Sequence, residues 1–141
     1  MTSETLSSEA LPATSLTSIQ LIEDLPLVQK VLRDLLEETG EFQVCVMSDT
    51  EAGAIADFIQ HQPAVVIVDL NLKQGSGLGF LQQVRRMHLH WRPVLIVVTN
   101  YAIAALESAC MRAGADHFLD KSRDLARLRE VIGQSLASPS P

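Results

Sequence analysis

The stretch Pro63-Ala-Val-Val-Ile-Val-Asp-Leu-Asn-Leu72 decides the fold, because its apolar part runs without a polar interruption. Four of the five residues from Ala64 to Val68 are β-branched. A short, continuously apolar run of this kind is typical of a strand that is buried on both faces of a parallel sheet. Ligands of open α/β sheets bind outside the carboxyl ends of the strands. Asp69 follows the run directly and is therefore the first candidate functional residue.

Apolar stretches and helical periodicity predict four more strands and five helices around this run. The strands are expected at residues 19–22, 42–47, 94–98 and 117–119, and the helices at 26–40, 52–59, 78–87, 102–113 and 123–136. Strands that alternate with helices require a parallel sheet with right-handed crossovers and helices on both faces. The predicted fold class is therefore α/β, a doubly wound (βα)5 sheet.

The helical stripes also predict which side chains of each helix pack on the sheet. In the first two helices these are Val28, Val31, Leu32, Leu35 and Leu36, then Ala52, Ile55, Ala56 and Ile59. In the last three helices they are Leu81, Val84 and Met87, then Ile103, Leu106 and Cys110, then Leu125, Leu128, Ile132 and Leu136.

The length of 141 residues suits one ordinary domain, which we place at residues 18–137. Residues 1–17 are rich in Ser and Thr and are interpreted as a flexible leader, and residues 138–141 as a frayed tail. No lysine or arginine precedes Lys30 and no transmembrane run is present, so neither a signal sequence nor membrane association is expected. We expect a cytoplasmic protein.

The charge balance argues against a nucleic-acid partner. With 11 basic and 17 acidic residues the net charge is −6, and Arg85-Arg86 is the only adjacent basic pair. We interpret that pair as part of a solvated helix face, since duplex binding needs a basic stripe. The two cysteines, Cys45 and Cys110, match no metal-ligand pattern and are expected to be free, fairly buried thiols in a reducing compartment.

Polar residues follow several predicted strands and should converge at one edge of the sheet. Glu23-Asp24 and Asp69 would bring three carboxylates together, which repel one another unless a cation or protons intervene. Hard oxygen ligands of this kind suit Mg²⁺ with phosphate as a co-ligand. Lys121 adds a point charge and Thr99 a hydroxyl donor. These are the parts needed to neutralise charge while a phosphoryl group is transferred to a carboxylate.

In this combination the residues resemble the receiver domain of two-component response regulators, over roughly residues 18–136. The resemblance rests on Glu23-Asp24, the Asp69-Leu-Asn-Leu turn, Gly77, Thr99 and Gly114-Ala-Asp-His-Phe-Leu-Asp-Lys121. The separations between Asp69, Thr99 and Lys121 fit the family as well. The resemblance implies a flavodoxin-like sheet with strand order 2-1-3-4-5.

The family resemblance also implies a phosphorylation site that binds Mg²⁺. Asp69 would accept a phosphoryl group from a phosphohistidine on a histidine kinase or histidine phosphotransfer protein. Asp24 would bind Mg²⁺ directly and Glu23 through water, while Asp69 and the backbone carbonyl of Asn71 would complete the protein ligands.

The remaining implied roles concern charge and switching. Lys121 would pair with Asp69 and then with the phosphoryl oxygen, and Thr99 would move toward the phosphoryl group and hydrogen-bond it. Phe118 would swing inward and remodel the face formed by the fourth helix, the fifth strand and the fifth helix. That face would bind the downstream protein partner, and a phosphorylation-linked homodimer is a further expectation.

Three positions depart from the family pattern. Lys73 and Ser122 stand where proline is usual, so we expect a looser loop after Asp69 and no cis peptide bond after Lys121, since non-proline cis peptides cost about 3 kcal/mol. Asn100 stands where a small residue is usual. Tyr101 and Asn71 flank the path of hydrolytic water in the family. We therefore hypothesise that Asn100 and Tyr101 shield the acyl phosphate and slow its hydrolysis.

The leading functional hypothesis is a phosphorylation-dependent signalling switch that acts by protein–protein interaction or phosphorelay and is not an enzyme. The short stretch after Lys121 has room for one helix, so no DNA-binding output domain is expected. Two alternatives remain open. One is a scaffold with a vestigial site that works without phosphorylation. The other is a Mg²⁺-dependent phosphohydrolase with Asp69 as nucleophile, which would need an acid where Asn71 stands.

Overall fold

The computed structural model describes residues 16–137, in which five parallel strands form one sheet. The sheet has the order β3-β2-β4-β5-β6, which in chain order of the strands is the expected 2-1-3-4-5. The strands are β2 (Thr17–Ile22), β3 (Phe42–Ser48), β4 (Val65–Val68), β5 (Val94–Thr99) and β6 (His117–Asp120). The predicted leader and tail lie outside the described residues, except for Leu16 and Thr17, the second of which already belongs to β2.

The central strand is β4, which contains the apolar run that predicted the fold. It pairs in parallel with β2 through Ile19↔Val65 and the residues that follow, and with β5 through Val65↔Val94 onward. All four of its residues are buried. A strand with paired neighbours on both edges and helices over both faces has no solvated side, which is why its sequence does not alternate between apolar and polar residues.

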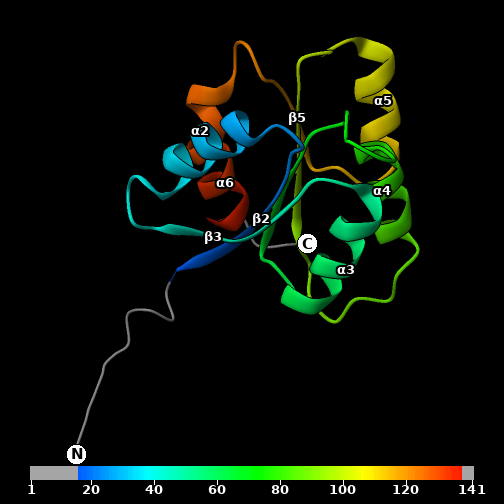
Figure 1. The fold of residues 1–141 in the computed structure, drawn as a ribbon, viewed down its shortest axis with the longest axis horizontal. Helices are drawn as coiled ribbons and strands as arrows, with labels where there is room; N and C mark the ends of the chain where they lie inside the picture. The colour runs from blue at the N-terminus through cyan, green and yellow to red at the C-terminus, as the bar shows by residue number, and fades with distance from the viewer. Residues whose placement is uncertain (1–15, 138–141) are drawn as a thin grey trace, which may run out of the picture.

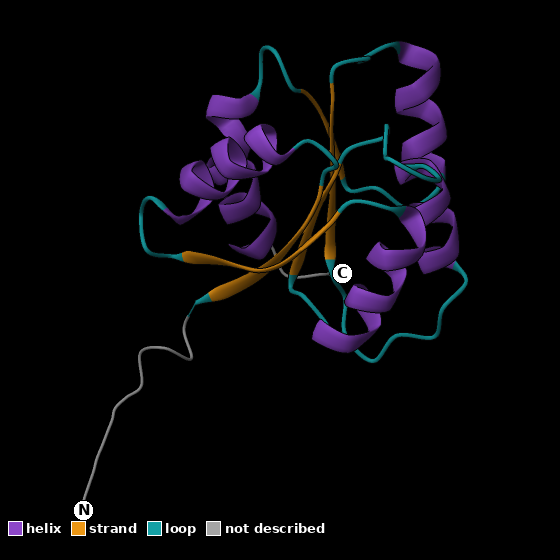
Figure 2. Ribbon diagram, in the orientation of Figure 1, coloured by secondary structure: helices purple, strands orange, loops and turns teal. Residues whose placement is uncertain are grey.

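Helices cover both faces of the sheet, as Figures 1 and 2 show. On one face lie α2 (Pro26–Glu37) and α6 (Leu128–Ala137), and on the other α3 (Glu51–His61), α4 (Gly77–Arg85) and α5 (Ala104–Arg112). The predicted last helix is divided, because a 3-10 turn, η2 (Leu125–Arg127), precedes α6. None of the helices in residues 16–137 has both the length and the apolar character needed to cross a membrane.

Each face of the sheet has its own apolar core. Below α2 and α6 the strand residues include Ile19, Leu21 and Ile67, and below α3, α4 and α5 they include Val66 and Val68. In the second core Phe58 meets Phe80 edge to face, with 5.7 Å between the ring centroids, and Trp91 at 5.2 Å. Both cysteines are free, with Cys110 buried and Cys45 half-buried.

The predicted core face of α3 is right for Ile55, which packs against the core, and wrong for its other three residues, because the helix is rotated relative to that expectation. Ala54 and Phe58 are fully buried, whereas Ile59 is 57% exposed and Ala52 and Ala56 are also exposed. The ring of Phe58 has the largest apolar surface on the helix, and its contacts with Phe80 and Trp91 set the rotation. Three other predicted core residues are exposed as well, namely Val31, Ile103 and Leu136.

The start of α4 packs so closely on β4 that only glycine fits at Gly77. A Cβ atom there would lie 2.2 Å from the backbone oxygen of Asp69 and 2.9 Å from Cγ2 of Val68. We expect Gly77→Ala to lower the free energy of unfolding by about 3 kcal/mol, because the backbone that carries Asp69 must move. Urea unfolding followed by circular dichroism measures this change.

Gly133 in α6 provides the matched control, since a Cβ atom there would have no neighbour within 4 Å. Alanine restricts the unfolded chain more than glycine does, so Gly133→Ala should raise the free energy of unfolding, by up to about 1 kcal/mol. Equal effects of the two substitutions would contradict the close packing at Gly77.

Candidate functional site

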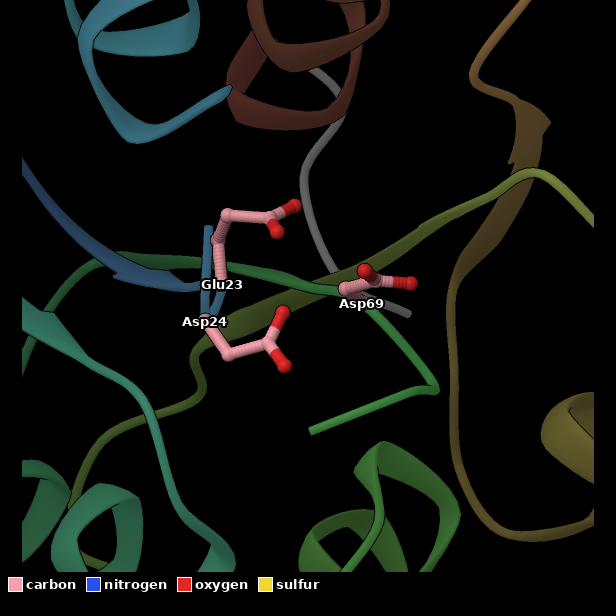
Figure 3. A group of neighbouring side chains, drawn as sticks. All are labelled: Glu23, Asp24 and Asp69. Atoms are coloured by element: carbon pink, nitrogen blue, oxygen red, sulfur yellow. The ribbon is translucent and has the colours of Figure 1, made fainter. Parts of the chain in front are cut away.

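Three carboxylates gather where β2 and β4 end. Glu23 and Asp24 follow β2, Asp69 follows β4, and one carboxylate oxygen from each lies within 4.8 Å of the other two. Figure 3 shows the three side chains around a common space. Glu23 is fully buried and Asp69 is 8% exposed. The parallel sheet therefore brings together residues that are far apart in the sequence, as the strand-end pattern predicted.

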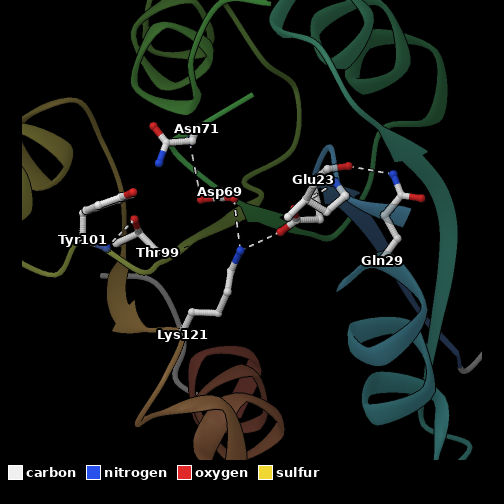
Figure 4. Close-up of polar contacts among 8 residues, drawn as sticks. Glu23, Gln29, Asp69, Asn71, Thr99, Tyr101 and Lys121 are labelled. Carbon is white, nitrogen blue, oxygen red and sulfur yellow. Dashed lines mark hydrogen bonds and ion pairs between the residues drawn. The ribbon is translucent and has the colours of Figure 1, made fainter. Parts of the chain in front are cut away.

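Lys121, which follows β6, supplies one positive charge to this cluster. Its Nζ lies 2.8 Å from Oε1 of Glu23 and 3.1 Å from Oδ2 of Asp69, as Figure 4 shows. Its backbone N–H donates to the carbonyl oxygen of Thr99 at 2.8 Å, and this hydrogen bond fixes the lysine next to β5. Two of the three carboxylates thus share one ammonium group, and Asp24 has no ion pair among the described residues.

Burial and pairing shift the ionisation of this group in defined directions. Burial raises the pKa of the Glu23 carboxyl, although hydrogen bonds from Lys121 and from the Leu25 N–H act in the opposite direction. Burial alone would lower the pKa of Lys121, but the hydrogen bonds and charges of Glu23 and Asp69 outweigh it and raise the pKa. Lys121 therefore stays charged, while the charged form of Glu23 carries a desolvation cost that a further cation would reduce.

The backbone around Glu23 is held from two directions. Its N–H donates to the carbonyl oxygen of Ser48 at 2.9 Å, and its own carbonyl oxygen accepts from Nε2 of Gln29 at 2.6 Å. Oε2 accepts from the backbone N–H of Leu25 at 3.1 Å. Sequence reasoning did not identify Gln29. Gln29 is a polar residue one turn into α2, the helix that begins just after Glu23-Asp24. That position is the signal from which its role could have been predicted.

Thr99 is fully buried at the end of β5, and its hydroxyl oxygen accepts from the backbone N–H of Tyr101 at 3.1 Å. Within residues 16–137 it makes no hydrogen bond to Asp69. The backbone N–H of Asn71 is 3.4 Å from Oδ1 of Asp69, which is a weak interaction at most. Phe118 is half-buried and packs against the core below α4 and α5.

An apolar hollow of about 450 Å³ adjoins the cluster. Asn71, Thr99 and Tyr101 line it, and 59% of the surface of Tyr101 is exposed. Asn100 is exposed next to it. The other lining residues are Leu70, Ser76, Leu78, Ile103 and Leu106. Two of the residues predicted to govern hydrolysis, Asn71 and Tyr101, thus border the same space.

The loop between β4 and α4 is tied to the loop between β3 and α3 through Lys73. The backbone N–H of Lys73 donates to the carbonyl oxygen of Asp49 at 3.2 Å, and Nζ lies 3.0 Å from Oδ2 of the same residue. Proline has neither the N–H nor the ammonium group, so lysine at this position adds two links that proline could not make. The expectation of a looser loop stays a prediction, and these two links act against it.

Glu51, the first residue of α3, makes a second tie to the same loop. Its backbone N–H donates to the carbonyl oxygen of Gln74, Oε1 accepts from the N–H of Ser76 at 3.0 Å, and Oε2 accepts from Nε2 of Gln83 at 2.6 Å. A Cβ atom on Gly79 would lie 2.4 Å from Oε1 of Glu51, so glycine leaves the space that the carboxylate occupies. Sequence reasoning missed Glu51 because an acid at a helix start has an ordinary explanation in the helix dipole.

The residues present fit a magnesium ion by their chemistry. Three carboxylates offer hard oxygen atoms at close range, one of them without an ion pair in the described chain, and the cluster has more negative than positive charge. The predicted part of the Asn71 backbone carbonyl stays a prediction. Ser122 follows Lys121 through a trans bond, since residues 16–137 contain no cis peptide.

Replacing Asp24 by asparagine tests the metal site directly. Without Mg²⁺, Asp24→Asn should raise the free energy of unfolding by about 1 kcal/mol, because one of three repelling charges is removed. In the unmodified chain, Mg²⁺ at about one hundred times its dissociation constant should add about 2.7 kcal/mol. In Asp24→Asn most of that gain should disappear. Urea unfolding with EDTA and with Mg²⁺ measures both effects.

The matched control is Asp34→Asn on α2, whose side chain is exposed and pairs with Lys30. This variant should keep the full response to Mg²⁺. An equal loss of the response in both variants would contradict a site at the strand ends.

Comparison with known proteins gives a consistent result. A model of the response regulator receiver domain matches residues 19–133. The response regulator Rre1 of Synechocystis sp. is 30% identical over 122 residues, which are 85% of this chain and 52% of that protein. The polar-differentiation response regulator DivK of Brucella ovis is 29% identical over 116 residues, 82% of this chain and 92% of that protein. The chain thus spans about half the length of the first relative and nearly all of the second.

Solved structures agree on the fold. A two-component response regulator of the LuxR family from Aurantimonas sp. superposes with a TM-score of 0.78 at 26% identity, covering 87% of this chain and 86% of that chain. The signal receiver domain of the putative response regulator NarL from Mycobacterium tuberculosis reaches a TM-score of 0.80 over 89% of this chain and 99% of that chain. At 18% identity this second likeness concerns the fold alone.

Proposed function

The chain belongs to the response regulator receiver domain family, and on that premise we propose that it is a signalling switch that is phosphorylated on Asp69. Receiver domains of this family serve phosphorylation-dependent signalling. The observation that carries the specific proposal is the position of the Asp69 carboxylate, which lies beside two further carboxylates and 3.1 Å from Nζ of Lys121. An oxygen nucleophile with a metal site and a cation has what phosphoryl transfer needs.

The donor would be a phosphohistidine on a histidine kinase or histidine phosphotransfer protein. An oxygen of Asp69 forms the new bond to phosphorus while the bond from phosphorus to the imidazole nitrogen breaks, and the electron pair stays on that nitrogen. Asp24 and Asp69, with Glu23 through water and the Asn71 carbonyl, would hold Mg²⁺. When bound, Mg²⁺ neutralises charge on the phosphoryl oxygens. The Lys121 ammonium, already beside Asp69, pairs with a phosphoryl oxygen of the product.

The switch would start at Thr99. Its hydroxyl now accepts a hydrogen bond from the Tyr101 N–H, and rotation toward a phosphoryl oxygen would break that bond and free the loop before α5. Phe118 lies beside Val97 in the β5–β6 register, and β5 separates its strand from β4, which Asp69 follows. Its inward movement would remodel the face of α5, β6 and α6, which a downstream protein or a second copy of the chain would recognise. Cytoplasmic location, homodimer formation and the lack of a DNA-binding domain stay predictions.

Phosphorylation by a small donor tests the proposal. Incubation with acetyl phosphate and Mg²⁺ should add about 80 Da, the mass of one phosphoryl group in place of a proton, as measured by intact-protein mass spectrometry. Asp69→Ala should remove the adduct because it removes the acceptor oxygen. The control Asp34→Ala changes an exposed aspartate on α2 and should keep it.

The same experiment separates the alternatives. If neither acetyl phosphate nor a phosphohistidine donor gives an adduct, the chain is a scaffold that works without phosphorylation. Multiple turnover on small phosphate esters would instead identify a phosphohydrolase. An adduct that persists in Asp69→Ala would place the phosphoryl group on another residue and overturn the assignment.

The lifetime of the acyl phosphate tests the shielding hypothesis. Tyr101 and Asn71 line the hollow beside the cluster and Asn100 is exposed next to it, so Asn100→Ala and Tyr101→Ala should open the path of water. We expect each to speed dephosphorylation by about tenfold, which corresponds to about 1.4 kcal/mol in the barrier. The measurement is the loss of the adduct after donor removal, and Met111→Ala, at an exposed position of α5 outside the hollow, is the control. Unchanged rates in both variants would refute the shielding.

A further inference from the structure

A second hollow of the molecule, of about 420 Å³, lies between α4 and α5. Three arginines line it, Arg85 and Arg112 in the last turns of the two helices and Arg86 directly after α4, together with Gln82, Ala109 and Ala113. Figure 1 shows the two helices on the same side of the sheet. Both begin after strand ends that carry the phosphorylation site, so their last turns lie toward the opposite edge of the sheet. We call this hollow the arginine groove.

The charges around the arginine groove differ from those of the rest of the surface. All 11 lysines and arginines lie within the described residues. Eight of them form ion pairs there, namely Lys30, Arg33, Lys73, Arg92, Lys121, Arg123, Arg127 and Arg129. Within residues 16–137, the three basic side chains that form no ion pair are those that line the groove. Three like charges around one hollow repel one another unless an anion lies between them.

The helix dipole explains part of this arrangement but not all of it. A cation in the last turn of a helix is favourable, which accounts for Arg85 and Arg112 taken singly. It does not account for Arg86 beside Arg85, nor for the convergence of all three on one hollow. The chain has 17 acidic and 11 basic residues, so acidic side chains are plentiful. Within the described residues, none of them forms an ion pair with an arginine of the groove.

The chemistry of the groove favours carboxylates on a flexible segment. Guanidinium groups pair with carboxylates in a planar, two-bond geometry, and the Gln82 amide adds a donor and an acceptor. Ala109 and Ala113 have only methyl side chains, which leaves room for a peptide backbone. The net charge of −6 repels long polyanions such as nucleic acid, whereas a short segment responds mainly to charges within a Debye length of about 8 Å. We propose that the arginine groove binds a short acidic segment of a partner protein.

A fluorescein-labelled hexaglutamate peptide is the probe, with hexaglutamine for comparison and the full chain as the receptor. Fluorescence anisotropy should show saturable binding of hexaglutamate that weakens as salt is added, and no binding of hexaglutamine. The triple variant Arg85→Gln, Arg86→Gln, Arg112→Gln should bind at least about tenfold more weakly, because charge-assisted hydrogen bonds are lost.

A control variant with the same change in charge separates the groove from the overall field of the protein. Lys30→Gln, Arg33→Gln, Arg127→Gln removes three exposed basic groups that lie outside the groove. It should bind hexaglutamate within about twofold of the unmodified chain, because the groove is intact. Circular dichroism and urea unfolding should show that both variants are folded. If the triple variant unfolds, Arg86→Gln alone, outside the helix, should still weaken binding severalfold.

Three outcomes would overturn the proposal. Hexaglutamate binding that is absent, or that falls equally in both triple variants, would show that the groove does not select carboxylates. Tighter binding of an oligothymidylate of equal charge would assign the groove to nucleic acid instead. Because the probe is tested on the unphosphorylated chain, the result does not depend on whether Asp69 is the phosphoryl acceptor.

Discussion

The ion pairs of one ammonium with two buried carboxylates hold the functional end of this molecule together. Lys121 follows β6, and its ammonium group contacts Glu23 after β2 and Asp69 after β4. It therefore links the ends of three strands. Breaking a buried pair leaves an uncompensated charge and costs several kcal/mol, so the arrangement of the three strand ends depends on this contact. Nearly everything else at the site positions one of these three groups or the loop that follows Asp69.

The loop that carries Asn71 is positioned by its neighbours rather than by its own sequence. Asp49 holds Lys73 from one side, and Glu51 holds Ser76 and the side chain of Gln83 from the other. Glycine at position 79 leaves room for the Glu51 carboxylate, and Gly77 lets α4 approach the Asp69 backbone. These ties run from the β3–α3 loop and the start of α3 to both ends of the segment, and they hold the backbone around Asn71 in place.

Periodicity and the strand-end rule predicted the order of elements, the sheet and the cluster, because these depend on patterns within short segments and on one topological rule. They failed where tertiary contacts decide. The rotation of α3 follows from Phe58 meeting Phe80 and Trp91, two partners far away in the sequence. Gln29 and Glu51 act through backbone atoms of other segments, so their side chains carry no local signature. Arg85 and Arg86 were interpreted as a solvated face, and Arg112 was not singled out, because sequence alone does not show which acids pair with the other eight basic residues.

The cluster also constrains the order of events at the site. With all four groups ionised, three carboxylates and one ammonium leave an excess of negative charge in a largely buried place. A phosphoryl donor is itself an anion and would be repelled there. Glu23 and Asp24 gain most from a divalent cation, since Glu23 carries the cost of burial and Asp24 has no ion pair in the described residues. If Asp69 is the phosphoryl acceptor, as proposed, cation binding would lower the electrostatic barrier that these carboxylates raise against the donor, and phosphorylation would then depend on the metal.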